Sequence, residues 1–124
     1  LPGIPIKILY PESIVYLLDS KLKKINLLKN MVKKLDLNNC YPIWSRLEEM
    51  LTSEWSHKFD YILCRSVKIL PEFVSAFKHI IKRNGKLVLY KSIDIEDTEI
   101  FKHKKIIELE SKIGIRKLIT VDMK

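Results

Sequence analysis

The sequence contains no apolar run long enough to cross a membrane and no recognisable signal peptide. Its two cysteines, Cys40 and Cys64, lack the spacing of metal ligands and stand among apolar residues. These absences predict a cytoplasmic protein without a membrane partner or a metal site, whose cysteines are reduced thiols in the core. Internal repeats, low-complexity runs and interdomain linkers are absent too, so we expect one monomeric domain over residues 1–124.

The composition is that of an ordinary globular chain with an excess of positive charge. Of the 124 residues, 47% are apolar and 31% are charged, and the formal net charge is +8. A charge of this sign favours a polyanionic partner such as RNA, because binding to phosphates releases their counterions. The excess is mostly lysine scattered over the predicted helices, and simple solvation of those surfaces explains it about equally well.

The hydrophobic pattern predicts an α/β fold that ends in an antiparallel hairpin. Strands and helices alternate along most of the chain, whereas the last two apolar segments are both strand-like and are separated by a short turn that contains Gly114. The predicted strands are residues 14–18, 41–44, 59–64, 87–90, 105–110 and 115–121, and the predicted helices are residues 21–35, a short one within 45–51, 71–83 and 94–103.

Three local signals predict how these helices begin and end. Ser20 is the expected N-cap of the first helix. Ser45 with Glu48 three residues later has the pattern of a capping box. Asn84-Gly85 follows the long third helix and is typical of a C-cap.

Polar residues end three of the predicted strands. Asp19, Arg65 and Lys91 each follow a buried apolar run. In doubly wound α/β folds the carboxyl ends of the strands face the ligand crevice, and an acid there commonly accepts hydrogen bonds from a nucleotide-type ribose. The alternative for Asp19 is a solvated turn residue without a ligand. The repetition at three strand ends favours a shared site.

These motifs, in this order, resemble the bacterial small-subunit ribosomal RNA methyltransferase G family, also called glucose-inhibited division protein B. The resemblance covers essentially the whole chain. It rests on L-P-G-I-P at residues 1–5, L-L-D-S-K-L-K-K at 17–24, S-R-L-E-E at 45–49, F-D-Y-I-L-C-R-S at 59–66 and L-Y-K-S at 89–92.

The resemblance implies a fold, a cofactor and a reaction. Members have a class I, Rossmann-like methyltransferase fold with a C-terminal β-hairpin. They use S-adenosylmethionine to methylate guanine N7 in a conserved loop of 16S ribosomal RNA, so the implied partner is that RNA or the small ribosomal subunit.

The family's site residues carry over by position. Leu1 and Gly3 correspond to the end of the glycine-rich cofactor loop, and Asp19 to the acid near the ribose. The pair lining the adenine pocket corresponds to Leu47 and Glu48. Arg65 corresponds to the cofactor-site arginine, and Lys91 is the candidate contact to an RNA phosphate or base edge. Lys91 is followed by Ser92 where the family usually has glycine.

The chain departs from the family at its start. The family's first strand, the acidic glycine-rich segment that leads into L-P-G-I-P, and the helical N-terminal region have no counterpart in these 124 residues. The first strand lies in the middle of the family's sheet. We therefore expect a fragment of a longer enzyme and a gap between the strands that would flank the missing one.

The residues also limit the chemistry. Guanine N7 carries a lone pair and no proton, so its methylation needs positioning and no general base. We accordingly interpret His57, His79 and His103 as structural or solvated.

Cys64 lacks the preceding proline of cytosine-methylating nucleophiles. Trp44, Trp55 and Tyr90 could stack on a base, although packing explains them more simply.

Two other functions stay open on the sequence alone. Asp19 would suit the ribose of a nicotinamide cofactor in a dehydrogenase equally well. Loss of the cofactor loop would instead leave a non-catalytic module that binds the ribosome. Titration with each cofactor distinguishes these functions from methyl transfer.

Overall fold

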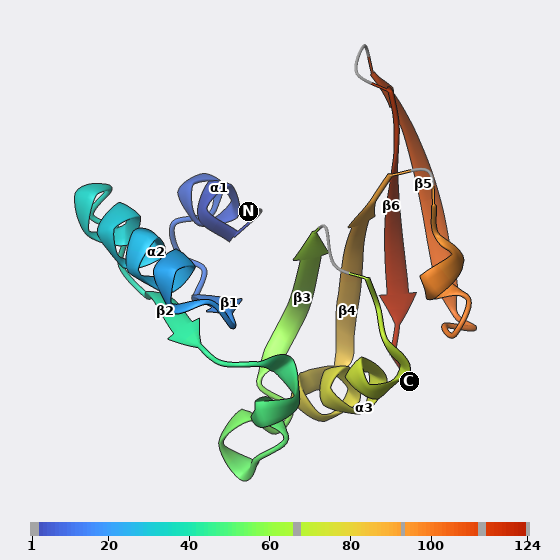
Figure 1. Ribbon diagram of the computed structural model, residues 1–124, viewed down its shortest axis with the longest axis horizontal. Coiled ribbons are helices and arrows are strands. Elements are labelled where there is room, and N and C mark those ends of the chain that lie inside the picture. The colour runs from blue at the N-terminus through green and yellow to red at the C-terminus, as the bar shows by residue number, and fades with distance from the viewer. Residues whose placement is uncertain (1–2, 66–67, 93, 112–113, 124) are drawn as a thin grey trace. The chain divides into compact units, whose positions relative to one another are not determined.

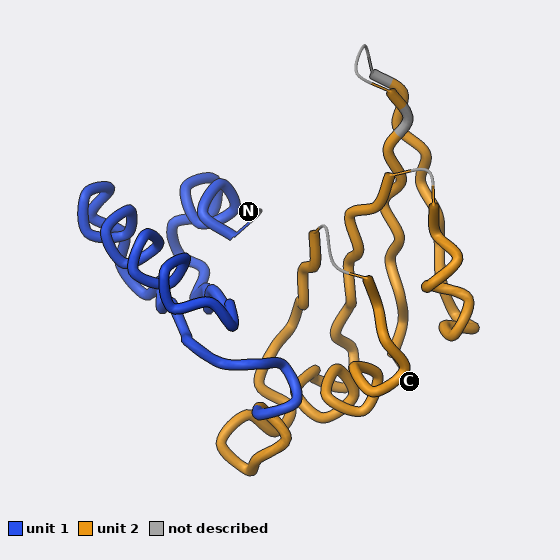
Figure 2. Tube along the Cα trace, viewed as in Figure 1, with its two compact units in different colours: residues 1–49 blue, residues 50–124 orange. Residues whose placement is uncertain are grey.

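The computed structural model describes residues 3–65, 68–92, 94–111 and 114–123. The chain divides into two compact units, residues 1–49 and 50–124 (Figure 2). Each unit has its own sheet (Figure 1), and the expectation of a single domain stays a prediction. None of the described helices is long and apolar enough to span a membrane.

The first unit packs two helices against a small parallel sheet. Helix α1 (Gly3–Leu9) precedes strand β1 (Val15–Asp19), and α2 (Leu22–Lys34) connects β1 to strand β2 (Cys40–Trp44). The strands pair in parallel with Asp19 opposite Trp44. The core consists of apolar side chains from all four elements, namely Ile4, Leu17, Ile25, Leu28 and Cys40. The predicted strands and helix are confirmed here.

Residues 3–9 form a helix that the alternating isoleucines do not predict. The Lys7 side chain in this helix is only 2% exposed. Its ammonium donates hydrogen bonds to the carbonyl oxygens of Pro11 and Ser13, at 2.7 Å in the case of Pro11. These bonds satisfy the charge that burial would otherwise make costly, and they fix the turn between α1 and β1.

The second unit is a four-stranded mixed sheet in the order β3-β4-β6-β5. Strand β3 (Phe59–Arg65) runs parallel to β4 (Ile81–Lys91), and β6 (Gly114–Asp122) pairs antiparallel with both β4 and β5 (Lys104–Ser111). Helix α3 (Pro71–Ile80) crosses from β3 to β4 and contributes Phe77 to the core beside Leu87, Leu89, Ile119 and Val121. The predicted C-terminal hairpin is confirmed.

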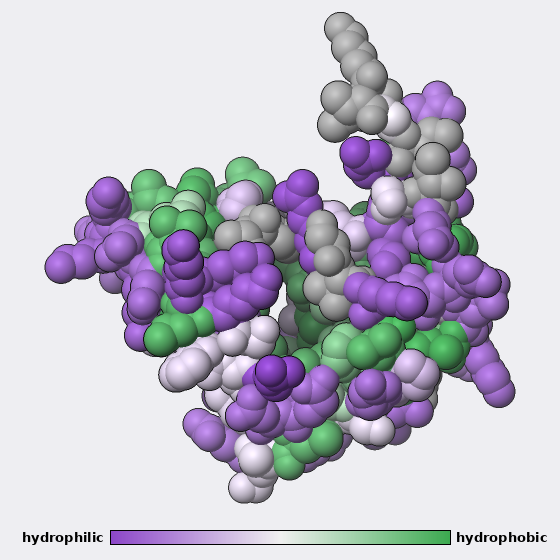
Figure 3. All heavy atoms as spheres, viewed as in Figure 1, coloured by the Kyte–Doolittle hydropathy of each residue, from purple (hydrophilic) through white to green (hydrophobic). Residues whose placement is uncertain are grey.

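Short 3-10 helices complete the chain: η1 (Leu47–Met50), η2 (Ser53–Trp55) and η3 (Glu96–Thr98). The last of these replaces the longer helix expected over residues 94–103. Hydrophobic residues reach the surface of both units (Figure 3). The large side chains Trp44 and Tyr61 are 61% and 65% exposed.

The predicted C-cap at Asn84-Gly85 is wrong. Helix α3 ends at Ile80, and Ile81 already has extended backbone angles. The backbone N–H groups of His57 and Lys58 donate to the carbonyl oxygens of His79 and Ile80, each at 2.8 Å. Because the last carbonyls of the helix find partners in a distant segment, the chain turns into β4 without a glycine cap.

Gly85 is required by close packing within the sheet. A Cβ atom there would lie 2.5 Å from Ile81 Cγ1 and 3.0 Å from the backbone oxygens of Asp60 and Lys82. We expect Gly85→Ala to lower the free energy of unfolding by roughly 1–3 kcal/mol, because the oxygens of two backbone segments must move. Urea denaturation followed by circular dichroism measures this. The exposed Ser75→Ala on α3 is the control, with a change within about 0.5 kcal/mol, and an equal effect of both would contradict the packing account.

Candidate functional site

The carboxyl edge of the first sheet is held together by backbone and indole hydrogen bonds. Asp19 is the last residue of β1, and its carbonyl oxygen accepts from the N–H of Ser45, 3.1 Å away, just after β2. Trp44 Nε1 donates to the carbonyl oxygen of Ser20 at 3.0 Å. These bonds place the Ser45–Glu49 segment beside the end of β1, so that Asp19 and the residues before Glu49 share one edge.

The Asp19 carboxylate has one oxygen occupied locally. Its Oδ1 accepts from the backbone N–H of Lys21 at 2.8 Å. The N-cap of α2 is Lys21, with no side-chain cap, so the predicted cap at Ser20 is wrong. The carboxylate takes over the role of stabilising the turn into α2. No described residue pairs with Oδ2, and this oxygen can accept a ligand's hydroxyl.

Glu48 is free of the capping role that the sequence predicts. Glu49 Oε1 instead accepts from the backbone N–H of Arg46 at 3.1 Å, and the Ser45 hydroxyl donates to the Arg46 carbonyl oxygen at 2.9 Å. The predicted Ser45–Glu48 capping box is therefore wrong, because the glutamate that accepts a backbone hydrogen bond near the start of η1 is Glu49, one residue later. Glu48 is exposed, and the described part of the chain gives its carboxylate no partner, while Leu47 is half-buried.

The carboxyl edge of the second sheet carries Arg65 and Lys91. They are the last residues of the parallel strands β3 and β4, and Arg65 pairs in register with Tyr90. Arg65 is exposed, and its guanidinium has no hydrogen-bond or ion-pair partner among the described residues. The sequence-predicted placement of both residues at one edge of parallel strands is thus confirmed for this unit.

Lys91 forms an ion pair that nothing in the sequence pattern indicates. Its Nζ lies 2.7 Å from Oδ2 of Asp97, and the two side chains are only 12% and 10% exposed. The same carboxylate oxygen accepts from the backbone N–H of Ile69 at 2.7 Å. Asp97 therefore joins the end of β4 to the segment that enters α3. This pair competes with the predicted contact of Lys91 to RNA, which stays a prediction.

The hydrogen bonds to Asp97 decide its ionisation. Burial alone would raise the pKa of this carboxyl, but the Ile69 N–H and the Lys91 ammonium outweigh burial and hold the pKa below its usual value. Asp97 is accordingly a charged structural anchor near neutral pH. Sequence reasoning missed it, and the acidic run from Asp94 to Glu99 was the signal available.

Leu1 and Gly3 are the residues predicted to belong to the cofactor loop. Leu1 lies outside the described residues. Gly3 begins α1, and a Cβ atom there would come within 2.3 Å of Leu17 Cδ2 in the core. The missing side chain of Gly3 makes room for Leu17, and its role toward a cofactor remains a prediction.

The thiols and imidazoles are not arranged for covalent or acid–base catalysis. Burial raises the pKa of Cys64 to about 11, against a lowering by Lys91, and burial likewise raises the pKa of Cys40. A thiol of that pKa is protonated and poorly nucleophilic near neutrality. His57 and His79 hydrogen-bond to backbone carbonyl oxygens of Ile81 and Thr52. Within the described ranges, no three His, Cys, Asp or Glu side chains could hold a metal ion.

Solved structures share the α/β fold of this chain. A crystal structure of a MtNAS mutant in complex with S-adenosylmethionine superposes with a TM-score of 0.74 at 10% identity, over 98% of this chain and 49% of that chain. Precorrin-6y C5,15-methyltransferase from Geobacter metallireducens gives a TM-score of 0.72 at 14% identity, over 95% of this chain and 71% of that chain. At these identities the likeness shows the fold alone, which is Rossmann-like and of class I, as the family resemblance implies.

The sequence comparisons are more specific. Residues 1–119 match the family model described as "GidB: rRNA small subunit methyltransferase G". Ribosomal RNA small subunit methyltransferase G from Actinobacillus succinogenes is 32% identical over 123 residues, which are 99% of this chain and 54% of that protein. The chain spans about half the length of the curated relatives it matches. A family model that matches nearly the whole chain shows its membership, and the chain belongs to the rRNA small subunit methyltransferase G family.

Proposed function

We propose that this chain is part of an enzyme that transfers a methyl group from S-adenosylmethionine to guanine N7 in 16S ribosomal RNA. The observation that carries the proposal is the family match over residues 1–119. The polar residues at the carboxyl ends of β1, β3 and β4 support it, because such positions face the ligand crevice in α/β folds. The family match also disfavours the nicotinamide-dependent alternative.

The residues of the first unit suit an adenosyl group. Ribose hydroxyls donate hydrogen bonds, and the free Oδ2 of Asp19 and the exposed carboxylate of Glu48 are acceptors. Both belong to segments joined at one edge by the Ser45 and Trp44 hydrogen bonds. Leu47, half-buried beside Glu48, offers an apolar wall for the adenine ring.

The reaction requires the protein to position the cofactor and the guanine relative to each other. Bound S-adenosylmethionine supplies an electrophilic methyl group, and guanine N7 supplies the lone pair that attacks it. Arg65 is better suited to organising the cofactor than to contacting N7, because a hydrogen bond donated to N7 would occupy that lone pair. The protonated state of Cys64 fits a direct transfer without a protein nucleophile.

We further propose that the chain works as the C-terminal portion of a longer monomeric enzyme in the cytoplasm, where the small ribosomal subunit is assembled. The observation that supports this is that the curated relatives are about twice as long as this chain. A ribosome-binding remnant without catalysis is the second candidate, favoured by the same partial coverage.

The test uses the 124-residue chain alone and the same chain preceded by the N-terminal half of the Actinobacillus succinogenes relative. With methyl-labelled S-adenosylmethionine and small ribosomal subunits that lack the modification, we expect the longer protein to label 16S RNA at guanine N7. Calorimetric titration of the longer protein with the cofactor distinguishes the remnant, which binds ribosomes and no cofactor. Failure of the longer protein to bind the cofactor or label the RNA would overturn the enzymatic proposal.

A further inference from the structure

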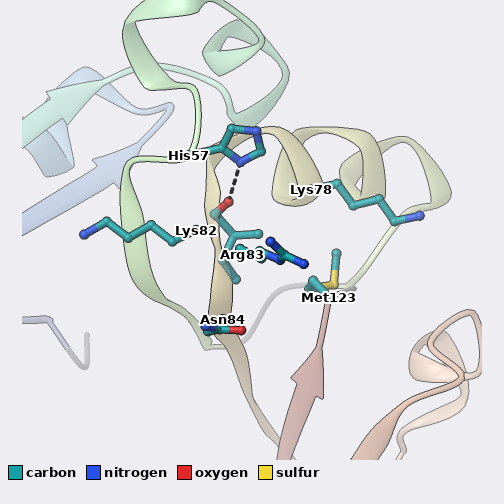
Figure 4. A pocket seen from close by; sticks show the side chains of 7 residues that line it. His57, Lys78, Lys82, Arg83, Asn84 and Met123 are labelled. Atoms are coloured by element: carbon teal, nitrogen blue, oxygen red, sulfur yellow. Dashed lines mark hydrogen bonds between the residues drawn. The ribbon is translucent and has the colours of Figure 1, made fainter.

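A basic pocket lies at the amino-terminal end of β4 in the second unit (Figure 4). Its volume is about 710 Å³, and it is lined by the polar residues His57, Lys78, Lys82, Arg83 and Asn84 and by the apolar residues Ile81 and Met123. Arg65 and Lys91 end β3 and β4 at the other edge of the same sheet. The pocket is thus separate from the site proposed for the reaction.

Hydrogen bonds between distant segments build this pocket. His57 Nδ1 lies 2.9 Å from the carbonyl oxygen of Ile81, and its backbone N–H donates to His79. The imidazole therefore donates through Nδ1 and leaves Nε2 without a described partner. These bonds hold His57 against the junction between α3, which carries Lys78, and β4, which carries Arg83.

The positive charge of the pocket is poorly compensated. Lys82 lies 3.4 Å from Asp60, but the two side chains are 51% and 73% exposed, and such a surface pair is weak. Among the described residues, neither Lys78 nor Arg83 has an acidic partner. Figure 4 shows the Lys78 and Arg83 side chains on the same side of β4 with Met123 beside them, while Lys82 points the other way. Two uncompensated cations at one concave surface favour a bound anion.

We propose that this pocket, through Lys78 and Arg83, binds the phosphodiester backbone of RNA away from the nucleotide that is methylated. The inference rests on the proposed function for the identity of the RNA. The regularly paired part of β4 begins at Lys86, and Lys91 lies five residues further on, which corresponds to about 17 Å, with Arg83 before this part. One nucleotide cannot span that distance, so the pocket holds a different part of the molecule. Contacts of this kind position the RNA without reading its sequence.

The experiment measures binding of a fluorescein-labelled RNA hairpin to the 124-residue chain by anisotropy, without S-adenosylmethionine, over a range of salt concentrations. The variant is Lys78→Ala with Arg83→Ala. We expect affinity to fall about 10-fold near 0.1 M salt and the slope of log K against log salt to become shallower by about 1.5, because two phosphate contacts are lost. Both side chains are exposed, and an unchanged urea midpoint verifies the fold.

The matched control is Lys102→Ala with Lys105→Ala, which removes the same charge from exposed positions at β5 and just before it. An equal loss in both double variants, an unchanged salt slope, or no RNA binding by the parent chain would overturn the proposal. Competition by polyglutamate as strong as that by unlabelled RNA would also overturn it in favour of an acidic protein partner. Because no cofactor is present, these outcomes do not depend on methyl transfer, which the labelling experiment tests separately.

Discussion

Replacing Asp97 by alanine is expected to lower the free energy of unfolding of this chain by about 3 kcal/mol, because it removes the carboxylate that pairs with the buried Lys91 ammonium. The variant also removes the acceptor of the Ile69 N–H, 2.7 Å away. Asp97→Asn keeps an oxygen for that N–H and should cost less. Urea denaturation followed by circular dichroism gives both values.

The pH dependence of this stability difference tests whether the charge of Asp97 is its cause. The pKa of Asp97 is lower in the folded chain than its ordinary value of 3.8, so its stabilisation is present above that value and is lost as pH falls through the folded pKa. The difference between parent and Asp97→Ala should therefore be constant near neutrality and shrink below about pH 4. The exposed neighbour Glu96→Ala serves as control, and an equal loss there would contradict a specific role for the pair.

Arg65→Ala is expected to weaken the binding of S-adenosylmethionine on the order of 100-fold, about 2.8 kcal/mol, because it removes charge-assisted hydrogen bonds at the end of β3. Calorimetric titration of the longer protein described above measures the affinity directly. Arg65→Lys keeps the charge and loses the fork geometry of the guanidinium, and it should recover only part of the affinity.

Arg83→Ala is the matched control for this measurement. It removes the same type of exposed side chain from the same sheet, but at the opposite end of the parallel strands. We expect it to leave cofactor affinity unchanged and to weaken RNA binding. Unchanged cofactor affinity in Arg65→Ala would refute the assignment of Arg65 and would favour a contact to the guanine edge instead.

Periodicity and strand composition were sufficient to predict most of the elements. Ile25 and Leu28 lie on the apolar face expected of α2 and are buried. The apolar runs before Asp19, Arg65 and Lys91 form strands that end at those residues. Such patterns are predictable because each depends on neighbouring residues that share one face of one element.

The failures come from contacts between residues far apart in the sequence. Asn84-Gly85 resembles a cap, yet the carbonyls of His79 and Ile80 are satisfied by residues 57 and 58, and β4 begins at Ile81. The Lys91–Asp97 pair matters because both side chains are largely buried and because Asp97 also accepts from the N–H of Ile69. Neither contact can be inferred from the spacing of residues in the sequence. Local signals cannot indicate which partner a helix end or a carboxylate finds after folding.

Strand β3 ends the second sheet on one side, with β4 as its neighbour in the order β3-β4-β6-β5. A terminal strand presents a row of backbone donors and acceptors that can template another β-segment, and Tyr61 on this strand is 65% exposed. Strand β3 contains no proline, and among its middle residues 60–64 only Asp60 is charged to oppose such pairing. At high concentration the isolated chain is consequently prone to edge-to-edge aggregation through β3, and work with it is best done in dilute solution.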